Sequence, residues 1–181
     1  DGARLIPLTG TDYRDFRPSV QLASAVFNNK VAYEFSGDFN IPLNWLELKI
    51  PEQSIAGKAP KDFINGGYTY LACTNAELYF NYPMFKFRPS QCDALHIDFW
   101  LNGQNIFRDG GTFSYNAGQK YIDYYGGVKS HNTVEFDSHE QMPRLSRFLL
   151  GDWLKTSTKS ELAVSNEYQT VTAGYKDRFG C

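Results

Sequence analysis

The chain has 181 residues, a formal net charge of −2 and 16% aromatic residues. This length allows one domain with a hydrophobic core, or one domain and part of another. The slightly negative charge argues against nucleic acid or an anionic membrane as the main partner. We also expect no membrane span, because no apolar run is long enough for a transmembrane helix.

The three cysteines predict neither a disulfide framework nor a cysteine zinc site, because their number is odd and no two form a CxxC pair. One disulfide with a spare thiol remains an alternative. The first residues, DGAR, do not resemble the start of a signal peptide, and the last residues stop within a strand-like pattern. We therefore interpret the sequence as a piece of a longer protein whose missing start hides any export signal.

The first predicted element is a helix within residues 11–27. Apolar residues recur there on one face at helical spacing, at Phe16, Val20, Ala23 and Phe27. Thr11 or Asp12 is the candidate N-terminal cap. Pro18 is tolerated only in the first turn of a helix, which favours a start near Arg17.

The next stretch, residues 28–67, is irregular and punctuated by prolines, and it predicts a linker with a short helix or strand at 45–48. From residue 67 onward the pattern is typical of antiparallel β structure. Asn102-Gly103 predicts a type I′ hairpin turn. The expected strands are 68–74, 76–82, two within 94–111, one at 132–137 and two or more after residue 147.

Two residues are candidates for metal binding or proton transfer. His131 precedes the expected strand 132–137, and a histidine there can bind a metal or move protons near neutral pH. A structural histidine bonded to a backbone carbonyl is the alternative. Asp109 stands before two glycines at the end of a strand and is either a metal ligand, a partner that orients a histidine, or a plain turn residue. Neighbouring antiparallel strands would bring Asp109 and His131 together.

Further candidates surround this pair in the sequence. Gln91 or His96 is a candidate third ligand, although an amide oxygen is a poor zinc donor. The glycine-flanked excursion 115–127 is expected to be a flexible loop, and it carries four tyrosines, which suit acid–base chemistry, sugar stacking or simple packing: Tyr115, Tyr121, Tyr124 and Tyr125. The sequence contains no phosphate-binding loop, nucleophile elbow or HExxH motif.

The segment DALHIDFWLNGQNIFRDGGTFSYN, followed by YYGGVKSHNTVEFDSHEQM, resembles the C-terminal sheet domain of heparinase II/III-like proteins, which are bacterial polysaccharide lyases and their relatives. The resemblance is specific from about residue 85 to 150. It implies a mainly β fold, an antiparallel β-sandwich over 67–181 that is truncated. DYRDFRPSVQLASAVF looks like a late helix of the α/α toroid in that family, so residues 1–66 would be the end of the toroid plus a linker.

The resemblance also implies an activity, the cleavage of uronic-acid-containing polysaccharide, such as a glycosaminoglycan, by β-elimination. A base removes the C5 proton, positive charge stabilises the enolate, and an acid protonates the leaving oxygen. The sandwich would form one wall of the substrate cleft and would be inactive alone. The implied partners are an acidic polysaccharide and the missing N-terminal toroid, and the implied location is the bacterial periplasm or cell envelope.

Carried over by resemblance, the metal ligands are Asp109, His131 and Gln91, and the implied cofactor is zinc. The catalytic residues would be His131 and Tyr121. Where the family has H-x-H-A-D, this chain reads PSQCD at 89–93, so Gln91 replaces a zinc-ligand histidine and Pro89 a catalytic one. The implied substrate contacts are Asn132, Tyr115 and Arg144, with Arg88 and Arg147 as further glycan contacts. A non-catalytic domain that binds acidic glycans and a purely structural sandwich are the alternatives.

Overall fold

The computed structural model describes residues 15–180, which belong to two compact units divided between Gly57 and Lys58. The first unit contains the predicted helix, α1, at Arg17–Asn28. It carries Pro18 in its first turn, where the missing N–H is not needed, so the start near Arg17 is confirmed. Phe16 precedes the helix without a side-chain cap. The predicted caps at 11 and 12 lie outside the described residues.

A buried glutamine on α1 organises the rest of this unit. The side chain of Gln21 donates from Nε2 to Asn40 Oδ1 at 2.9 Å and accepts through Oε1 from the N–H groups of Ala32 and Tyr33. The chain then forms a 3₁₀ turn, η1, at Asp38–Asn40 and a short helix, α2, at Ile41–Trp45. The element expected at 45–48 is therefore only the end of α2 and the turn that follows it.

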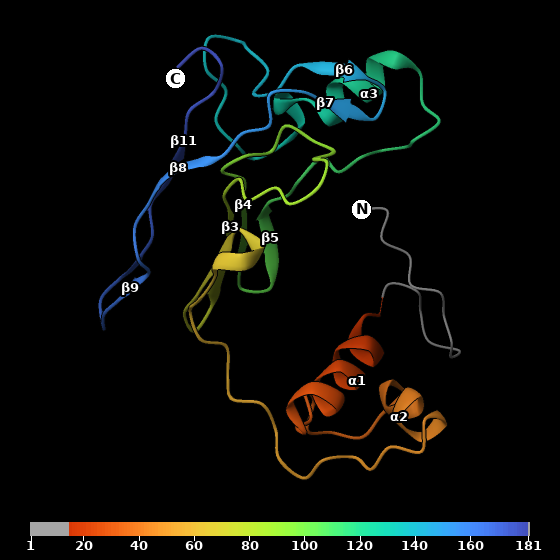
Figure 1. Cartoon of the computed structure of the whole chain (residues 1–181). Helices are drawn as coiled ribbons and strands as arrows, with labels where there is room; N and C mark the ends of the chain where they lie inside the picture. The colour runs from red at the N-terminus through yellow and green to blue at the C-terminus, as the bar shows by residue number, and fades with distance from the viewer. Residues whose placement is uncertain (1–14, 181) are drawn as a thin grey trace. The chain divides into compact units, whose positions relative to one another are not determined.

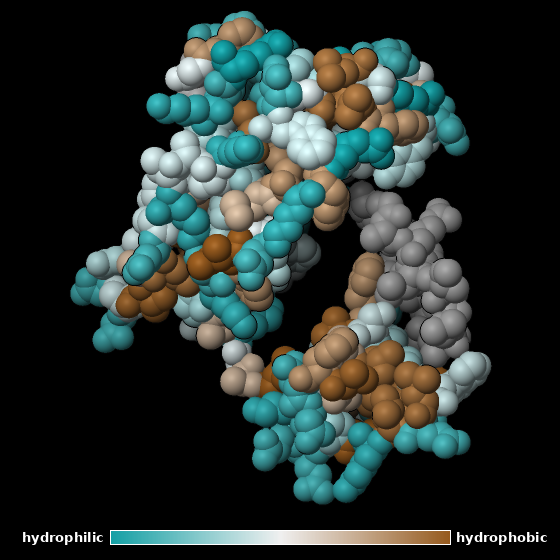
Figure 2. Space-filling model, viewed as in Figure 1, coloured by the Kyte–Doolittle hydropathy of each residue, from teal (hydrophilic) through white to brown (hydrophobic). Residues whose placement is uncertain are grey.

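The first unit exposes much apolar surface (Figure 2). Its exposed large apolar side chains include Val20, Val26, Phe27, Trp45 and Leu46. A patch of this kind is typical of surface that packs against another protein element.

The second unit contains a five-stranded antiparallel sheet in the order β1-β2-β3-β4-β5. Figure 1 labels three of these strands, β3, β4 and β5. Its strands are β1 Lys61–Phe63, β2 Tyr68–Ala72, β3 Ala76–Asn81, β4 Ile97–Leu101 and β5 Gln104–Phe107, with a 3₁₀ turn, η2, at Ile64–Gly66. Asn102 and Gly103 join β4 to β5 with φ of 50° and 75°. Positive φ at both positions is the signature of a type I′ turn, so the predicted hairpin is confirmed.

Three two-stranded antiparallel ladders complete the described strands. They pair β6 Arg144–Ser146 with β7 Leu149–Leu150, β8 Thr156–Lys159 with β11 Ala173–Tyr175, and β9 Ala163–Val164 with β10 Gln169–Thr170. The prediction of mainly antiparallel β structure after a helical segment is confirmed. The buried apolar cluster draws on loops as well as strands, and its members are Cys92, Ala94, Val128, Met142, Leu150, Leu154 and Tyr175.

Two local predictions are wrong. Residues 132–137 form no strand, and the only pairing there is an isolated bridge between Phe136 and His139. Asp137 and Ser138 have φ of 47° and 59°, which turns the chain before a ladder can grow. The tyrosine-rich excursion is not a loop throughout, because it contains a helix, α3, at Gln119–Gly126, followed by a 3₁₀ turn, η3, at Val128–Ser130.

Cys73 is exposed and Cys92 is buried, and both are free thiols. Cys181 lies outside the described residues. Between residues 15 and 180, no helix combines the length and apolarity that crossing a membrane requires.

Candidate functional site

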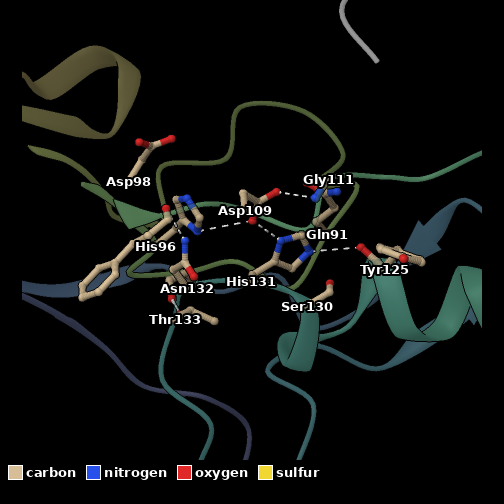
Figure 3. Close-up of polar contacts among 12 residues, drawn as sticks. Gln91, His96, Asp98, Asp109, Gly111, Tyr125, Ser130, His131, Asn132 and Thr133 are labelled. Atoms are coloured by element: carbon tan, nitrogen blue, oxygen red, sulfur yellow. Dashed lines mark hydrogen bonds and ion pairs between the residues drawn. The ribbon is translucent and has the colours of Figure 1, made fainter. Parts of the chain in front are cut away.

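The site is centred on Asp109, which follows β5, and His131, which follows η3. Nδ1 of His131 lies 2.6 Å from Oδ1 of Asp109, and Nε2 lies 3.1 Å from the carbonyl oxygen of Tyr125 (Figure 3). Both ring nitrogens therefore face acceptors, and only a doubly protonated imidazolium donates to both. The side chain of His131 is 1% exposed. Sequence reasoning placed these two residues side by side, and the structure brings them together.

A glycine allows the two segments of the pair to approach closely. The N–H of Gly110 donates to the carbonyl oxygen of Ser130 at 3.0 Å. A Cβ at Gly110 would lie 2.5 Å from that oxygen, so a larger residue would force the segments apart. Oδ2 of Asp109 accepts the N–H of Gly111 at 2.7 Å, which fixes the orientation of the carboxylate.

The electrostatics of the pair agree with an ion pair. Burial alone would lower the pKa of His131, but the hydrogen bond to Asp109 and the charges of Asp109 and Asp93 outweigh burial, and its pKa lies above the ordinary value. Burial alone would raise the pKa of Asp109, but hydrogen bonds from His131 and Gly111 outweigh it, and its pKa lies below the ordinary value. At neutral pH the carboxylate is charged and the imidazole is biased toward its charged form.

A second histidine lies on the other side of Asp109. Nδ1 of His96 is buried, lies 3.7 Å from Oδ1 of Asp109 and has no hydrogen-bond partner (Figure 3). Its ring meets that of His131 in a T-shaped contact with centroids 6.4 Å apart. Asp93 completes the charged surroundings, and burial raises its pKa against the opposing effect of the two histidines. The cluster thus holds two carboxyl groups and two imidazoles.

The residues proposed as zinc ligands do not fit a zinc ion as they lie. A histidine binds metal through a ring nitrogen with a free lone pair, and both nitrogens of His131 are engaged. Gln91 uses its amide Nε2 to donate to Thr112 Oγ1 at 3.1 Å. Among residues 15–180, no three His, Cys, Asp or Glu side chains form a group suited to a metal ion. Zinc binding stays a prediction for metal analysis to test.

A buried glutamine that the sequence reasoning missed holds the segment after His131 in place. Oε1 of Gln141 accepts the N–H of Ala94 at 2.9 Å. Its Nε2 donates to the carbonyl oxygens of Ala94 and Val134, both at 3.2 Å, and to Thr133 Oγ1 at 3.1 Å. We call these hydrogen bonds of Gln141 to Ala94, Thr133 and Val134 the Gln141 clamp. They take the place of the strand pairing that was expected at 132–137. In the sequence, Gln141 stands in the polar stretch SHEQMPR, and nothing there distinguishes it from a surface glutamine.

A small pocket of about 140 Å³ adjoins the ion pair, since Tyr125 lines the pocket and binds His131 through its carbonyl oxygen. We call it the arginine pocket. Three guanidinium groups contribute to its wall, and none of its lining residues carries a carboxylate. The residues that matter for its chemistry are Arg88, Arg144, Arg147, Tyr115, Tyr125 and Phe148. Such a site favours an anion.

The three guanidinium groups differ in how many contacts they make with the rest of the protein. Arg147 donates from Nη2 to the carbonyl oxygens of Tyr115 and Ala117, and so orders the loop before α3. Arg144 donates from Nη1 to the carbonyl oxygen of Arg147 at 3.2 Å, and its Nε lies 3.6 Å from Oδ1 of Asp123, an exposed carboxylate on α3 that does not line the pocket. Arg88 is exposed and has no hydrogen bond or ion pair with the rest of the described chain. Its five N–H donors are available to a ligand.

The remaining predicted site residues divide between pocket and surroundings. Tyr115 and Arg144 line the arginine pocket. Asn132 donates from Nδ2 to the carbonyl oxygen of Phe107 at 2.6 Å, so its amide holds the end of β5. Tyr121 is 41% exposed on α3, stacks on Phe113 with centroids 5.1 Å apart, and does not line the pocket.

Comparison with known proteins identifies the family to which this chain is similar. The family model described as "Heparinase II/III-like, C-terminal" matches residues 55–181. A solved structure of a heparinase III with methylated lysines is similar, with a TM-score of 0.58 and 16% identity over 90% of this chain and 23% of that chain. The chain thus spans less than a quarter of that structure, and the likeness supports the β-sandwich fold. A search of curated proteins finds no match.

Proposed function

Because the chain belongs to the heparinase II/III-like C-terminal family, we propose that it forms the sheet domain of a polysaccharide lyase. The substrate is a uronic-acid-containing polysaccharide, and the reaction is β-elimination. The observation that carries the proposal is the arginine pocket, with three guanidinium groups and no carboxylate in its wall. Guanidinium groups bind carboxylates in bidentate geometry, and a carboxylate is what distinguishes a uronate from a neutral sugar.

The pocket suits the electrostatic demand of β-elimination. Removal of the C5 proton delocalises negative charge onto the uronate carboxylate, while the bond from C4 to the leaving oxygen breaks and that oxygen takes up a proton. Arg88, Arg144 and Arg147 would bind the carboxylate and stabilise the charge that develops on it. Tyr115, exposed at the pocket wall, would contact the sugar ring.

In this proposal His131 is a positioning residue. Its buried ring holds the carbonyl of Tyr125, which lies in the pocket wall, and its two N–H groups are already committed. Tyr121 stays a candidate acid or base, although it stands outside the arginine pocket. We propose that a helical toroid domain supplies the opposite wall of the cleft and the remaining catalytic groups.

The binding step is tested with the chain itself and four polymers: hyaluronan, heparan sulfate, alginate and polygalacturonate. Calorimetric titration should detect binding of at least one, and Arg88→Gln should weaken it about tenfold, the effect of one charge-assisted hydrogen bond. Arg178→Gln is the matched control, since that guanidinium is exposed, lies outside the arginine pocket and, among residues 15–180, contacts only Asp152, at 4.0 Å, and the ring of Phe179. If wild type and Arg88→Gln bind the polymers with equal affinity, the arginine pocket is not the binding site.

The lyase step is tested with the full-length protein and the same polymers. An unsaturated uronate product absorbs ultraviolet light, so cleavage appears as a rise in absorbance that Arg88→Gln should reduce. Binding without any rise would support the alternative of a non-catalytic domain that binds acidic glycans. Gln91 and Pro89, which replace histidines of the family pattern, favour that alternative. If the protein neither binds nor cleaves any of the four polymers, a purely structural sandwich is the remaining alternative.

A further inference from the structure

We propose that a cavity in the first unit binds the side chain of a lysine residue that another polypeptide presents. The cavity has a volume of about 250 Å³, and its wall contains residues of α1, η1 and the segments 31–36 and 50–54. It shares no lining residue with the arginine pocket. The inference is therefore independent of the proposed lyase function. We call this site the glutamate cavity.

The charge of the glutamate cavity is negative. Glu34 and Glu52 line it, and no lysine, arginine or histidine does. Ser54 Oγ donates to Oε1 of Glu34 at 2.7 Å, which leaves Oε2 of Glu34 and both carboxylate oxygens of Glu52 without a hydrogen bond within residues 15–180. An ionised carboxylate only accepts, and its strongest partners are positively charged donors. The cavity therefore favours a cation.

A buried amide with a free donor lines the same cavity. Asn40, in η1, is only 8% exposed. Its Oδ1 accepts from Nε2 of Gln21 at 2.9 Å, whereas its Nδ2 donates to no partner within residues 15–180. A donor with so little access to water gains from an acceptor. The ligand should therefore offer an acceptor beside its positive charge, as the backbone carbonyl of a lysine residue does.

The rest of the wall suits an alkyl stem better than a hydrated metal ion. Val31, Phe35, Ile50 and Pro51 line the cavity, and Phe35 is 60% exposed. Lysine buries its methylenes on such surface, and an aromatic ring adds a cation–π attraction. Among residues 15–180, no three His, Cys, Asp or Glu side chains are grouped as a metal ion needs. An amino sugar would place hydroxyl groups against the apolar wall, where they would lack partners.

Hydrogen bonds order the cavity wall before a ligand enters. Oε1 of the buried Gln21 accepts the N–H of Tyr33 at 3.0 Å, and its Nε2 donates to the carbonyl oxygen of Tyr33 at 3.3 Å. Val31 pairs with Ser54 in an isolated parallel bridge, where the N–H of Ile55 donates to the carbonyl oxygen of Val31 at 2.9 Å. These contacts fix the segments that carry the two glutamates, which lowers the entropic cost of binding.

The test titrates the purified, isotope-labelled chain with Nα-acetyl-lysine N-methylamide, which carries the ammonium group, the alkyl stem and two carbonyl groups. NMR spectra should show a saturable shift of the side-chain amide of Asn40, with a dissociation constant in the millimolar range. Nα-acetyl-norleucine N-methylamide has the same stem without the ammonium group, and it should bind about fivefold more weakly. Equal binding of the two probes would overturn the inference.

Two variants locate the binding site of the lysine probe. Glu34→Gln and Glu52→Gln should each weaken its binding about threefold, because each removes one charge and preserves the size of the side chain. Glu47→Gln is the matched control, since Glu47 is exposed in the same unit and does not line the cavity. The inference fails if Glu47→Gln weakens binding as much as the two cavity variants do.

Calcium chloride and glucosamine test the other cations that two carboxylates attract. Tighter binding of glucosamine than of the lysine probe would assign the cavity to an amino sugar and overturn the inference. Displacement of the lysine probe by an equal concentration of calcium would assign the cavity to a metal ion and overturn it too. If no probe shifts the side-chain amide of Asn40, the cavity is not a binding site, and the proposed function of the arginine pocket is unaffected.

Discussion

Nδ1 of His131 lies 2.6 Å from Oδ1 of Asp109, in a place where the histidine side chain is 1% exposed. The second nitrogen of the same ring faces the carbonyl oxygen of Tyr125. One imidazolium thus ties the end of β5 to the C-terminal end of α3. Removal of one member of a buried charged pair leaves the other without a partner, so this contact is a sensitive point of the fold.

Asp109→Asn should lower the free energy of unfolding by about 2 kcal/mol, because it leaves the buried imidazole without its charged partner. The carboxylate is 30% exposed, so solvent screens part of the effect. Urea denaturation measures the change. Asp152→Asn, at an exposed side chain, is the control and should match wild type. Equal loss in both variants would contradict a specific role for the ion pair.

The stability of the chain should depend on pH through the same pair. The pKa of His131 is raised above 6.5, so its contribution is fully present below that value and is lost as pH rises through the folded-state pKa. The pKa of Asp109 is lowered below 3.8, so its contribution is lost only as pH falls through the folded-state value. The neighbouring titratable groups are Asp93, which acts on His131, and His96, which acts on Asp109.

Urea denaturation at about pH 5.5 and about pH 8.5 checks this dependence. Wild type should lose more unfolding free energy between the two values than His131→Gln, which has no titrating ring. His139→Gln is the control, because His139 is exposed and lies apart from the ion pair, in the isolated bridge with Phe136. The same pH dependence in wild type and His131→Gln would contradict the prediction.

Gln141→Ala should destabilise the second unit by about 1–3 kcal/mol, since it leaves the buried N–H of Ala94 and carbonyl oxygen of Val134 without their partner. The midpoint of urea denaturation reports the change. Gln104→Ala removes an exposed amide from the β4–β5 hairpin and should shift stability by less than about 0.5 kcal/mol. If the two variants are equally stable, the clamp does not hold the segment.

Gly126→Ala should weaken binding of a uronate probe without unfolding the protein. A Cβ at this position would lie 2.1 Å from Nη2 of Arg144, so the guanidinium must leave its place in the arginine pocket. The expected loss of tetragalacturonate affinity is about tenfold. Gly118→Ala, where a Cβ meets nothing within 4 Å, is the control for adding a methyl group near α3. Unchanged affinity in Gly126→Ala would show that Arg144 does not contact the ligand.

Iodoacetamide should modify Cys73 in the native protein and leave Cys92 intact. Burial raises the pKa of the Cys92 thiol to about 12, so almost no reactive thiolate forms at neutral pH. Its Sγ donates to the carbonyl oxygen of Met142 at 3.5 Å within the apolar cluster. Peptide mapping by mass spectrometry reads both sites, and concentrated urea should expose Cys92. Rapid native labelling of Cys92 would contradict its place in the core.

The helix and hairpin predictions succeeded where a local rule decides the backbone. Pro18 marks the first turn of α1 because its ring suits only that position. Asn102 and Gly103 adopt positive φ, which few other residue pairs tolerate, and so determine the hairpin between β4 and β5. The two predicted site residues, Asp109 at a strand end and His131 before an expected strand, do meet in the structure.

The two wrong local predictions concern segments that contact residues elsewhere in the chain. Residues 132–137 alternate as a strand does, but Gln141 and Ala94 hold Thr133 and Val134 in irregular backbone. Gln141 and Ala94 are 47 residues apart, so no window of local sequence contains the clamp. The expected loop at 115–127 instead contains α3, although three tyrosines and a glycine among its eight residues are weak helix formers, and Phe113, outside the helix, stacks on Tyr125.

The sequence by itself determined the antiparallel meander and its hairpin, the start of the helix and the identity of the central aspartate and histidine, because each depends on backbone preferences or periodicity within a few residues. Only the tertiary structure decided that both nitrogens of His131 are occupied, and that Arg88, Arg144 and Arg147 share one pocket. These are contacts between distant segments. Their geometry depends on how the core packs, and local residue patterns do not encode it.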